Sequence, residues 1–365
     1  MQSTPPNRGS RLVSIDALRG MALLFMVIDH SFDWWLAEAY RGGMADQLTE
    51  FIGTLAAPIF VSLVGVGVAI SVGRAKVRQP NGAILWRGFR RGMFFILLGY
   101  GLNFIVFFAG SNWNDVFAVD VLHLIGLGVF LGTLVAQFAS WWACMALAVI
   151  WMVGSALFGG QLVLPPALGA WVNGLSSTGY FPVLPWLAFI WFGLGTGKLI
   201  LLAGMRRAMD GPYVRSDWLA LVGAGFFALF LIVPNGGFRH PRLAFVCLSL
   251  AILFLLWAGF QRLATVSCLT RRFIVAPMAV IGQVAFMLYV LHHLLGYRLM
   301  MAAGLVTGRS WQGQYGALTP EQCLILLFLL LAVCWTGAYG WIRIRHDVQV
   351  QTLGRIPGFR DFASS

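Results

Sequence analysis

The sequence predicts an all-α polytopic membrane protein of about ten transmembrane helices, with both termini in the cytoplasm. Hydrophobic residues make up 59% of the 365 residues and charged residues only 10%, whereas a soluble domain is roughly 25% charged. Apolar segments of about twenty residues, long enough to cross a bilayer, recur along nearly the whole chain and are too many for one buried core. We therefore expect one integral-membrane domain over residues 1–365, with polar cytoplasmic tails at 1–10 and 346–365.

The predicted spans and the basic residues between them fit one topology. The spans cover residues 14–36, 48–72, 86–108, 117–137, 140–158, 183–203, 216–234, 243–262, 275–300 and 320–342. With a cytoplasmic N-terminus, all but five of the 25 Lys and Arg residues lie on the cytoplasmic side or at its helix ends, as the positive-inside rule requires. The net charge of +12 therefore indicates topology and contact with anionic membrane lipids, and we expect no nucleic-acid partner.

The first predicted span carries charged and titratable side chains along one face. Arg19 and His30 are eleven residues apart, and at 100° per residue this spacing returns to within about 20° of the same direction. The helix rise separates them by roughly 16 Å, and Asp16 lies near the same stripe. Because charges inside a membrane helix are costly, we expect this stripe to be functional; the structural alternative is an intramembrane pair of Arg19 with Asp16.

Histidines from three predicted spans reach a similar level in the outer half of the membrane. His30 lies in the second half of the first span, His123 lies near the start of the fourth, and His292 lies in the last turns of the ninth. Imidazoles suit acid–base catalysis, and Asp33, three residues after His30, could hold one ring nitrogen and leave the other free as a base, or could simply be solvated. A metal site from the three histidines is conceivable, but no two-histidine motif on one helix supports it, and we expect no metal.

Two of these histidines also have simpler interpretations. His123 follows Asp120 by three residues, the spacing of an ordinary pair at a helix start. His292 and His293 are adjacent and point about 100° apart, so at most one of them need face a cavity, and the sequence leaves open which one.

Several motifs, taken in their order, resemble one known family. They are Arg11-Leu-Val-Ser-Ile-Asp-Ala-Leu-Arg-Gly20, Asp29-His30, Ala57-Pro-Ile-Phe-Val-Ser-Leu-Val-Gly65, Arg90-Arg91-Gly-Met-Phe-Phe-Ile-Leu-Leu-Gly99, Phe181-Pro-Val-Leu-Pro-Trp186 and Gly282-Gln-Val-Ala-Phe-Met-Leu-Tyr-Val-Leu-His292. The chain resembles the heparan-alpha-glucosaminide N-acetyltransferase catalytic-domain family, which includes many bacterial inner-membrane proteins. Matching motif positions are Asp16, Arg19, Pro58, Pro185, Trp186 and His292. The spacing of Arg19 and His30 is also similar to that of the wider acyltransferase-three membrane enzymes, which acylate surface sugars.

The resemblance implies a transmembrane acyltransferase, and an acetyltransferase in particular. It implies cytoplasmic acetyl-CoA as the acyl donor and a hydroxyl or amine of a glycan or lipid-linked sugar as the acceptor at the outer face. The family's active-site histidine lies in the loop after the first helix, and the corresponding loop here contains none, so His30 would take the role of base. Asp33 would orient His30, and His292 or His123 would share proton handling or help polarise the thioester carbonyl.

The resemblance also implies donor contacts. Arg19 would meet an anionic or carbonyl part of the donor, and Arg90, Arg91 and Lys198 would attract the phosphates of CoA at the cytoplasmic mouth. Those last three equally fit a role as topology determinants.

The alternative function is a proton-coupled transporter or flippase whose intramembrane His and Asp residues relay protons. The sequence leaves open the acceptor, the acyl chain length, direct transfer against an acetyl-enzyme intermediate, and the oligomeric state, with a homodimer among the alternatives.

Overall fold

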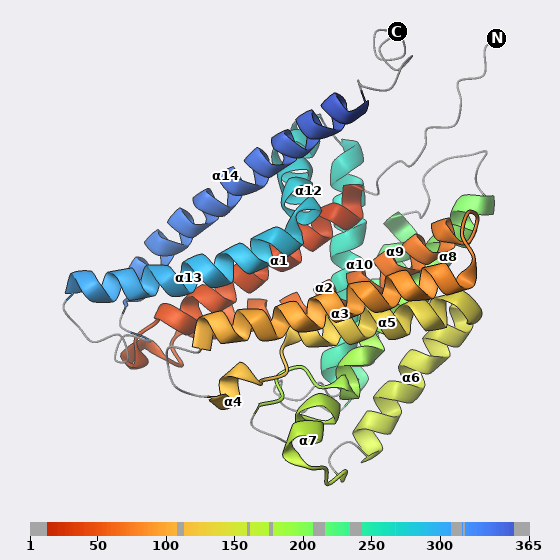
Figure 1. Ribbon diagram of the computed structural model, residues 1–365, viewed down its shortest axis with the longest axis horizontal. Coiled ribbons are helices and arrows are strands. Elements are labelled where there is room, and N and C mark those ends of the chain that lie inside the picture. The colour runs from red at the N-terminus through yellow and green to blue at the C-terminus, as the bar shows by residue number, and fades with distance from the viewer. Residues whose placement is uncertain are drawn as a thin grey trace. The chain divides into compact units, whose positions relative to one another are not determined.

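The computed structural model describes residues 13–107, 113–158, 161–174, 178–206, 216–233, 243–266, 268–307, 316 and 318–353. Regular structure in these ranges is helical (Figure 1). Two isolated bridge contacts, Leu36 with Leu318 and Val119 with Gly179, add to the helices. The predicted fold class, an all-α membrane protein, is confirmed at this level.

Within the described ranges, seven helices are long and apolar enough to cross a membrane. They are α2 (Met44–Ala75), α3 (Asn81–Phe107), α5 (Val121–Phe138), α6 (Trp141–Phe158), α8 (Val183–Arg206), α10 (Leu243–Val266) and α14 (Pro320–Leu353). Helices α12 (Ala276–Gln283) and α13 (Ala285–Thr307) are bent by 79° at the break between them and form an eighth span if they cross together.

The two other predicted spans are helical as well. Helix α1 (Val13–Trp35) carries Asp16, Arg19, Asp29 and Asp33 within its 23 residues, and α9 (Ser216–Ile232) has only 17 residues. Each predicted span therefore falls on one helix or on the bent pair. The count of ten crossings and the cytoplasmic side of both termini stay predictions.

Two predicted boundaries differ from the structure. The fourth span begins at Val121 and not at residue 117, because Asp120 caps the helix there. Helix α14 continues to Leu353 and so enters the predicted tail at 346–365, since no Gly or Pro interrupts residues 341–353.

Shorter elements are η1 (Glu38–Tyr40), α4 (Trp113–Val116), α7 (Pro166–Val172), α11 (Cys268–Thr270) and the π-helix η3 (Arg271–Val275). The tail at 1–10, residues 354–365, Arg11, Arg207, Arg239, Arg242 and Arg309 lie outside the described residues.

Contacts divide the chain into two compact units, residues 1–50 with 272–365 and residues 51–271. We call them the first and the second unit. The expectation of a single integral domain stays a prediction. In the first unit α1 packs against α12, α13 and α14, and in the second α3 packs on α5, α6 on α8 and α9 on α10.

Two glycines let α1 and α12 approach closely in the first unit. A Cβ atom on Gly20 would collide with the carbonyl oxygen of Met278, and a Cβ atom on Gly282 would collide with that of Asp16. Small residues at such contacts bring helix backbones together in membranes, where packing rather than the hydrophobic effect drives association. This contact lets the backbones of α1 and α12 pack directly against each other.

The end of α1 is tied to the other helices of the first unit by backbone. The indole N–H of Trp35 donates to the carbonyl of Gly296 on α13 at 3.2 Å. The N–H of Ala37 donates to Leu318, and the N–H of Leu318 donates to Trp35, both at 2.9 Å. Trp35 and Leu36 are fully buried. These bonds hold the last turns of α1 beside α13, where the histidines lie.

Candidate active site

Three histidines meet between α1 and α13 in the first unit. Nδ1 of His30 lies 3.1 Å from Nε2 of His292. The ring of His293 lies 5.0 Å from that of His30 and 4.2 Å from that of His292, measured between centroids. His292 is completely buried, and the other two are half-buried. The structure therefore brings into contact His30 and His292, which the sequence placed only at a similar level.

The backbone of α13 determines which nitrogen of each ring is protonated. Nδ1 of His292 lies 3.1 Å from the carbonyl oxygen of Leu288, and Nδ1 of His293 lies 3.0 Å from that of Tyr289. A carbonyl oxygen only accepts, so both neutral rings carry their proton on Nδ1 and present an unprotonated Nε2. His30 must then donate its own Nδ1–H to Nε2 of His292. In the neutral cluster this leaves Nε2 of His30 as a lone pair, which is the state that a general base requires.

Two further neighbours of His30 are His293, which the sequence left open as an alternative to His292, and Trp34, which the sequence reasoning missed. His293 belongs to the cluster together with His292, although only one of the two was needed. Trp34 lies four residues after His30, and its ring is 5.3 Å from His30 and 5.4 Å from His293. The i, i+4 spacing of His30 and Trp34 was the available signal, because such pairs share a helix face.

Asp33 does not orient His30, and this part of the prediction is wrong. Its carboxylate lies 3.4 Å from a guanidinium nitrogen of Arg41, whose other nitrogen donates to the Asp33 carbonyl at 2.6 Å. The Asp33 side chain is 68% exposed. His292 holds Nδ1 of His30 instead, because α13 packs on the face of α1 that carries His30, while Asp33 points toward the turn after α1.

Arg19 makes the contacts of the structural alternative. Its guanidinium donates to the Asp16 carboxylate at 3.0 Å and to the carbonyl of Gly282 at 3.4 Å. The Arg19 side chain is 27% exposed and that of Asp16 15%. The pair thus neutralises two charges within α1 and ties them to α12, beside the Gly20–Gly282 contact.

His123 lies in the second unit, where it caps α5. The Asp120 side chain accepts from the first backbone N–H groups of the helix, and Nδ1 of His123 accepts from the Asp120 N–H at 3.0 Å. This reciprocal arrangement is a capping box with a histidine in the usual Glu position. The ring is completely buried and packs 4.1 Å from Tyr100. The structure therefore shows the helix-start interpretation, and the predicted proton-handling role of His123 has no contact that supports it among the described residues.

Lys198, Arg90 and Arg91 do not converge on one site. The ammonium group of Lys198 donates to the carbonyl of Ala136 at 2.7 Å, and Lys76 donates to that of Gln137. Both carbonyls belong to the last turn of α5, where cations are favoured by the helix dipole. Arg90 and Arg91 are exposed on α3. The ammonium group of Lys198 therefore caps a helix, and its assignment to CoA phosphates stays a prediction without a supporting contact among the described residues.

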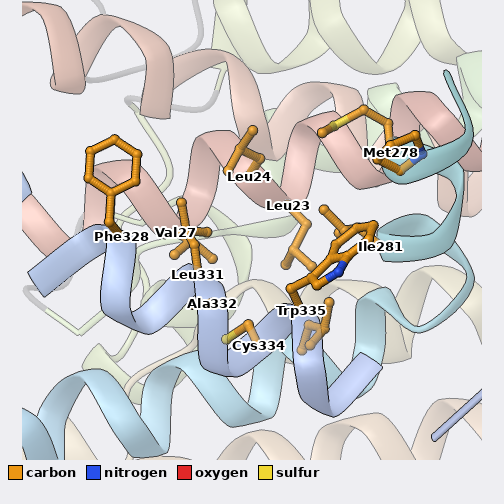
Figure 2. Close-up of a pocket in the computed structure, with 12 residues that line it drawn as sticks. Leu23, Leu24, Val27, Met278, Ile281, Phe328, Leu331, Ala332, Cys334 and Trp335 are labelled. Carbon is orange, nitrogen blue, oxygen red and sulfur yellow. The ribbon is translucent and has the colours of Figure 1, made fainter. Parts of the chain in front are cut away.

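An apolar hollow of about 480 Å³ lies along the same helices as the histidines (Figure 2). Leu23 and Val27 line it from α1, Met278 and Ile281 from α12, and Phe328 and Trp335 from α14. Val27 precedes His30 by one turn, and Leu288, another lining residue, precedes His292 by one turn. Figure 2 shows apolar side chains on its walls, among them the thioether of Met278 and the indole of Trp335, so the hollow suits a hydrocarbon chain and not a charged group.

The same three histidines also have the composition of a metal site. Their ligand nitrogens lie within 4.8 Å of one another, and imidazoles that donate their other N–H to a backbone carbonyl are common ligands of Zn²⁺. The set differs from the one considered from sequence, because His293 takes the place of His123. A direct hydrogen bond between His30 and His292 already accounts for their spacing, and we keep the expectation that no metal is needed.

The fold and this site define a class of protein: an integral membrane protein with a hydrogen-bonded histidine pair between two of its helices. The family model described as "Heparan-alpha-glucosaminide N-acetyltransferase, catalytic" matches residues 11–234, which is more than half of the chain. The chain belongs to this family, and membership indicates a transmembrane N-acetyltransferase, a transferase. No curated protein matches the chain. The family match includes His30 and ends before α13, so it does not cover the partner His292.

Proposed function

We propose that this protein moves an acetyl group from cytoplasmic acetyl-CoA to a hydroxyl or amine of a glycan or glycolipid at the outer face of a bacterial inner membrane. The observation that carries the proposal is the hydrogen-bond chain from Leu288 through His292 to His30, which leaves Nε2 of His30 unprotonated. Family membership supports the reaction class, and the donor and the acceptor are our inference.

In this mechanism His30 is the general base. Nε2 of His30 takes the proton of the acceptor as the acceptor oxygen or nitrogen attacks the thioester carbonyl. The tetrahedral intermediate then expels the CoA thiolate, which receives that proton from His30. The new C–O or C–N bond replaces the C–S bond, and CoA leaves as the thiol. Direct transfer needs only this one base.

His292 stabilises the charged form of His30. Once His30 is an imidazolium, its Nδ1–H donates to Nε2 of His292 as a charge-assisted hydrogen bond, which is stronger than the neutral bond before transfer. An interaction that strengthens as the proton moves lowers the barrier, because it favours the transition state over the ground state. A carboxylate at this position would have the same role, as in a Ser-His-Asp triad.

The apolar hollow supports an acceptor that carries a hydrocarbon chain. It lies one helical turn from both His30 and His292, so a chain in the hollow would place a polar head near the histidines. A glycolipid or lipid-linked sugar combines a hydrocarbon chain with a polar head, whereas a free sugar has no such chain.

The test measures transfer of radiolabelled acetyl groups from acetyl-CoA to dodecyl β-glucoside and dodecyl β-glucosaminide, with glucose and glucosamine as unchained controls. The purified protein is held in a polyoxyethylene detergent, so that no other sugar is present. We expect transfer to the alkyl sugars that exceeds transfer to the free sugars and is lost in His30→Ala. Acetyl-CoA should also raise the melting temperature, as a ligand of the folded state does.

A transporter or flippase is the second candidate, and the break between α12 and α13 favours it. The helices are bent by 79° there, and broken helices are common at the substrate sites of transporters. Reconstituted vesicles that show pH-driven flux of a labelled lipid-linked sugar without acetyl transfer would support this candidate over the enzyme.

A further inference from the structure

A second hollow, in the second unit, has the opposite chemistry to the apolar one. We call it the basic hollow. It has a volume of about 430 Å³ and is lined by Arg74, Arg78 and Arg87, with Ser71 and Gln79. Gly67, Ser71 and Arg74 follow one face of α2, the chain continues through Arg78 in the turn after it, and Arg87 comes from the first turns of α3. The three arginines therefore line one space at the end of a helical hairpin.

No carboxylate balances these arginines in their own segment. Residues 51–114 contain no Asp or Glu, although the stretch from 74 to 91 holds six Lys and Arg. In the described part of the chain, no ion pair is formed by Arg74 or Arg78, and Arg87 donates to the side-chain oxygen of Gln79. Like charges that line one hollow repel one another, and an anion bound between them relieves this repulsion.

The lysines of the region are engaged elsewhere. Lys76 and Lys198 donate to carbonyls at the end of α5, so the cations left at the hollow are all guanidiniums. Arginine binds phosphate through a planar fork that makes two parallel hydrogen bonds, whereas general attraction to lipid headgroups needs only lysines near the surface. A concave polar space with three forks fits a ligand with more than one phosphate.

We propose that the basic hollow binds the phosphate groups of the acetyl-CoA donor. This assignment rests on the proposed function for its ligand, and it replaces Arg90, Arg91 and Lys198 with Arg74, Arg78 and Arg87. CoA carries a pyrophosphate and a 3′-phosphate, and the hairpin lies on the side that the positive-inside rule assigns to the cytoplasm, where the donor is found.

The experiment measures equilibrium binding of radiolabelled acetyl-CoA to the full-length protein in a neutral detergent. Arg74→Gln, Arg78→Gln and Arg87→Gln are compared with Arg90→Gln and Arg91→Gln from the same hairpin. Arg262→Gln, whose arginine pairs with Asp217 at 2.6 Å, is the control for loss of one charge. We expect each hollow variant to weaken binding about 10- to 100-fold, with little change in the other three.

Two further measurements identify the phosphates. Dephospho-acetyl-CoA, which lacks the 3′-phosphate, should bind the wild type more weakly and should bind at least one hollow variant as well as acetyl-CoA does. Arg74→Lys keeps the charge without the fork and should still lose affinity. Unchanged melting temperatures for the apo variants show that folding is not the cause.

The outcomes separate this inference from the proposed function. If the wild type binds no acetyl-CoA, the proposed function fails. If it binds and the hollow variants bind equally well, or if only Arg90→Gln and Arg91→Gln bind weakly, the hollow is not the donor site. In the lipid arm, nanodiscs with phosphatidylglycerol are compared with nanodiscs of phosphatidylcholine. If phosphatidylglycerol competes with acetyl-CoA for the wild type, and this competition disappears in the hollow variants, the hollow binds a lipid headgroup. That result would overturn the proposal.

Discussion

His292 on α13 and His123 on α5 make a direct comparison, because both imidazoles have 0% exposure. Nδ1 of His292 donates to a backbone carbonyl in its own helix, and its Nε2 is left to accept from His30. Nδ1 of His123 instead accepts from the backbone N–H of Asp120, which completes a helix cap. The His292 ring is hydrogen-bonded to a side chain of a second helix, whereas the His123 ring caps its own helix. Burial and residue type are equal, so the backbone partner of Nδ1 is what separates a candidate catalytic histidine from a structural one.

The largest effect that tests this comparison is expected from His30→Ala. Loss of a general base lowers the transfer rate by typically about 10²–10⁴-fold, while acetyl-CoA binding and the melting temperature should change little. Acetyl transfer and donor affinity, measured on the same preparation, check both expectations. Turnover at the wild-type rate would remove His30 from the mechanism.

A smaller loss is expected from His292→Phe. The variant keeps much of the ring volume but leaves Nδ1–H of His30 without an acceptor, so the imidazolium is less stabilised. We expect a rate about 10- to 100-fold lower, with a smaller change in the KM for the donor. The kcat and KM values report this directly. If His292→Phe is as slow as His30→Ala, His30 and His292 act as one catalytic unit and their effects are not additive.

His123→Ala should act on stability and not on the chemistry. The variant removes the acceptor of the Asp120 N–H and leaves a cavity beside Tyr100, which together destabilise by about 2 kcal/mol. A melting temperature lowered by several degrees, with the transfer rate per folded molecule near that of the wild type, is the expected pattern. If fully folded His123→Ala protein has lost turnover, His123 takes part in catalysis after all.

Removal of metal should have the smallest effect. If His30, His292 and His293 interact through hydrogen bonds alone, dialysis against EDTA leaves acetyl transfer unchanged. Metal analysis of the purified protein by mass spectrometry provides the second measurement. One zinc per chain, with activity lost on chelation and restored by Zn²⁺, would show that the three histidines are metal ligands and not a hydrogen-bonded acid–base cluster.

Local spacing was a good guide wherever the partner lay within one or two helical turns. The pair of Arg19 with Asp16 and the helix-start pair of His123 with Asp120 were both available from three-residue spacings, and both are present. The same reasoning failed for Asp33, which has the right spacing to reach His30 but turns to Arg41. Arg41 is eight residues from Asp33 and His30 only three, so the turn after α1, and not the spacing, decided between the two partners.

The sequence by itself determined the all-helical membrane class, the approximate positions of the helices and the stripe that carries Arg19 and His30, because these depend on apolar length and on the helical repeat. Tertiary structure alone decided that His30 meets His292, which is 262 residues away, that His293 joins them, and that Lys198 caps α5 while Arg74, Arg78 and Arg87 share a hollow. The physical reason is that such contacts require two helices to approach at one level. Here that approach depends on the Gly20–Gly282 contact and on the backbone bonds at the end of α1, and no periodicity within one helix encodes it.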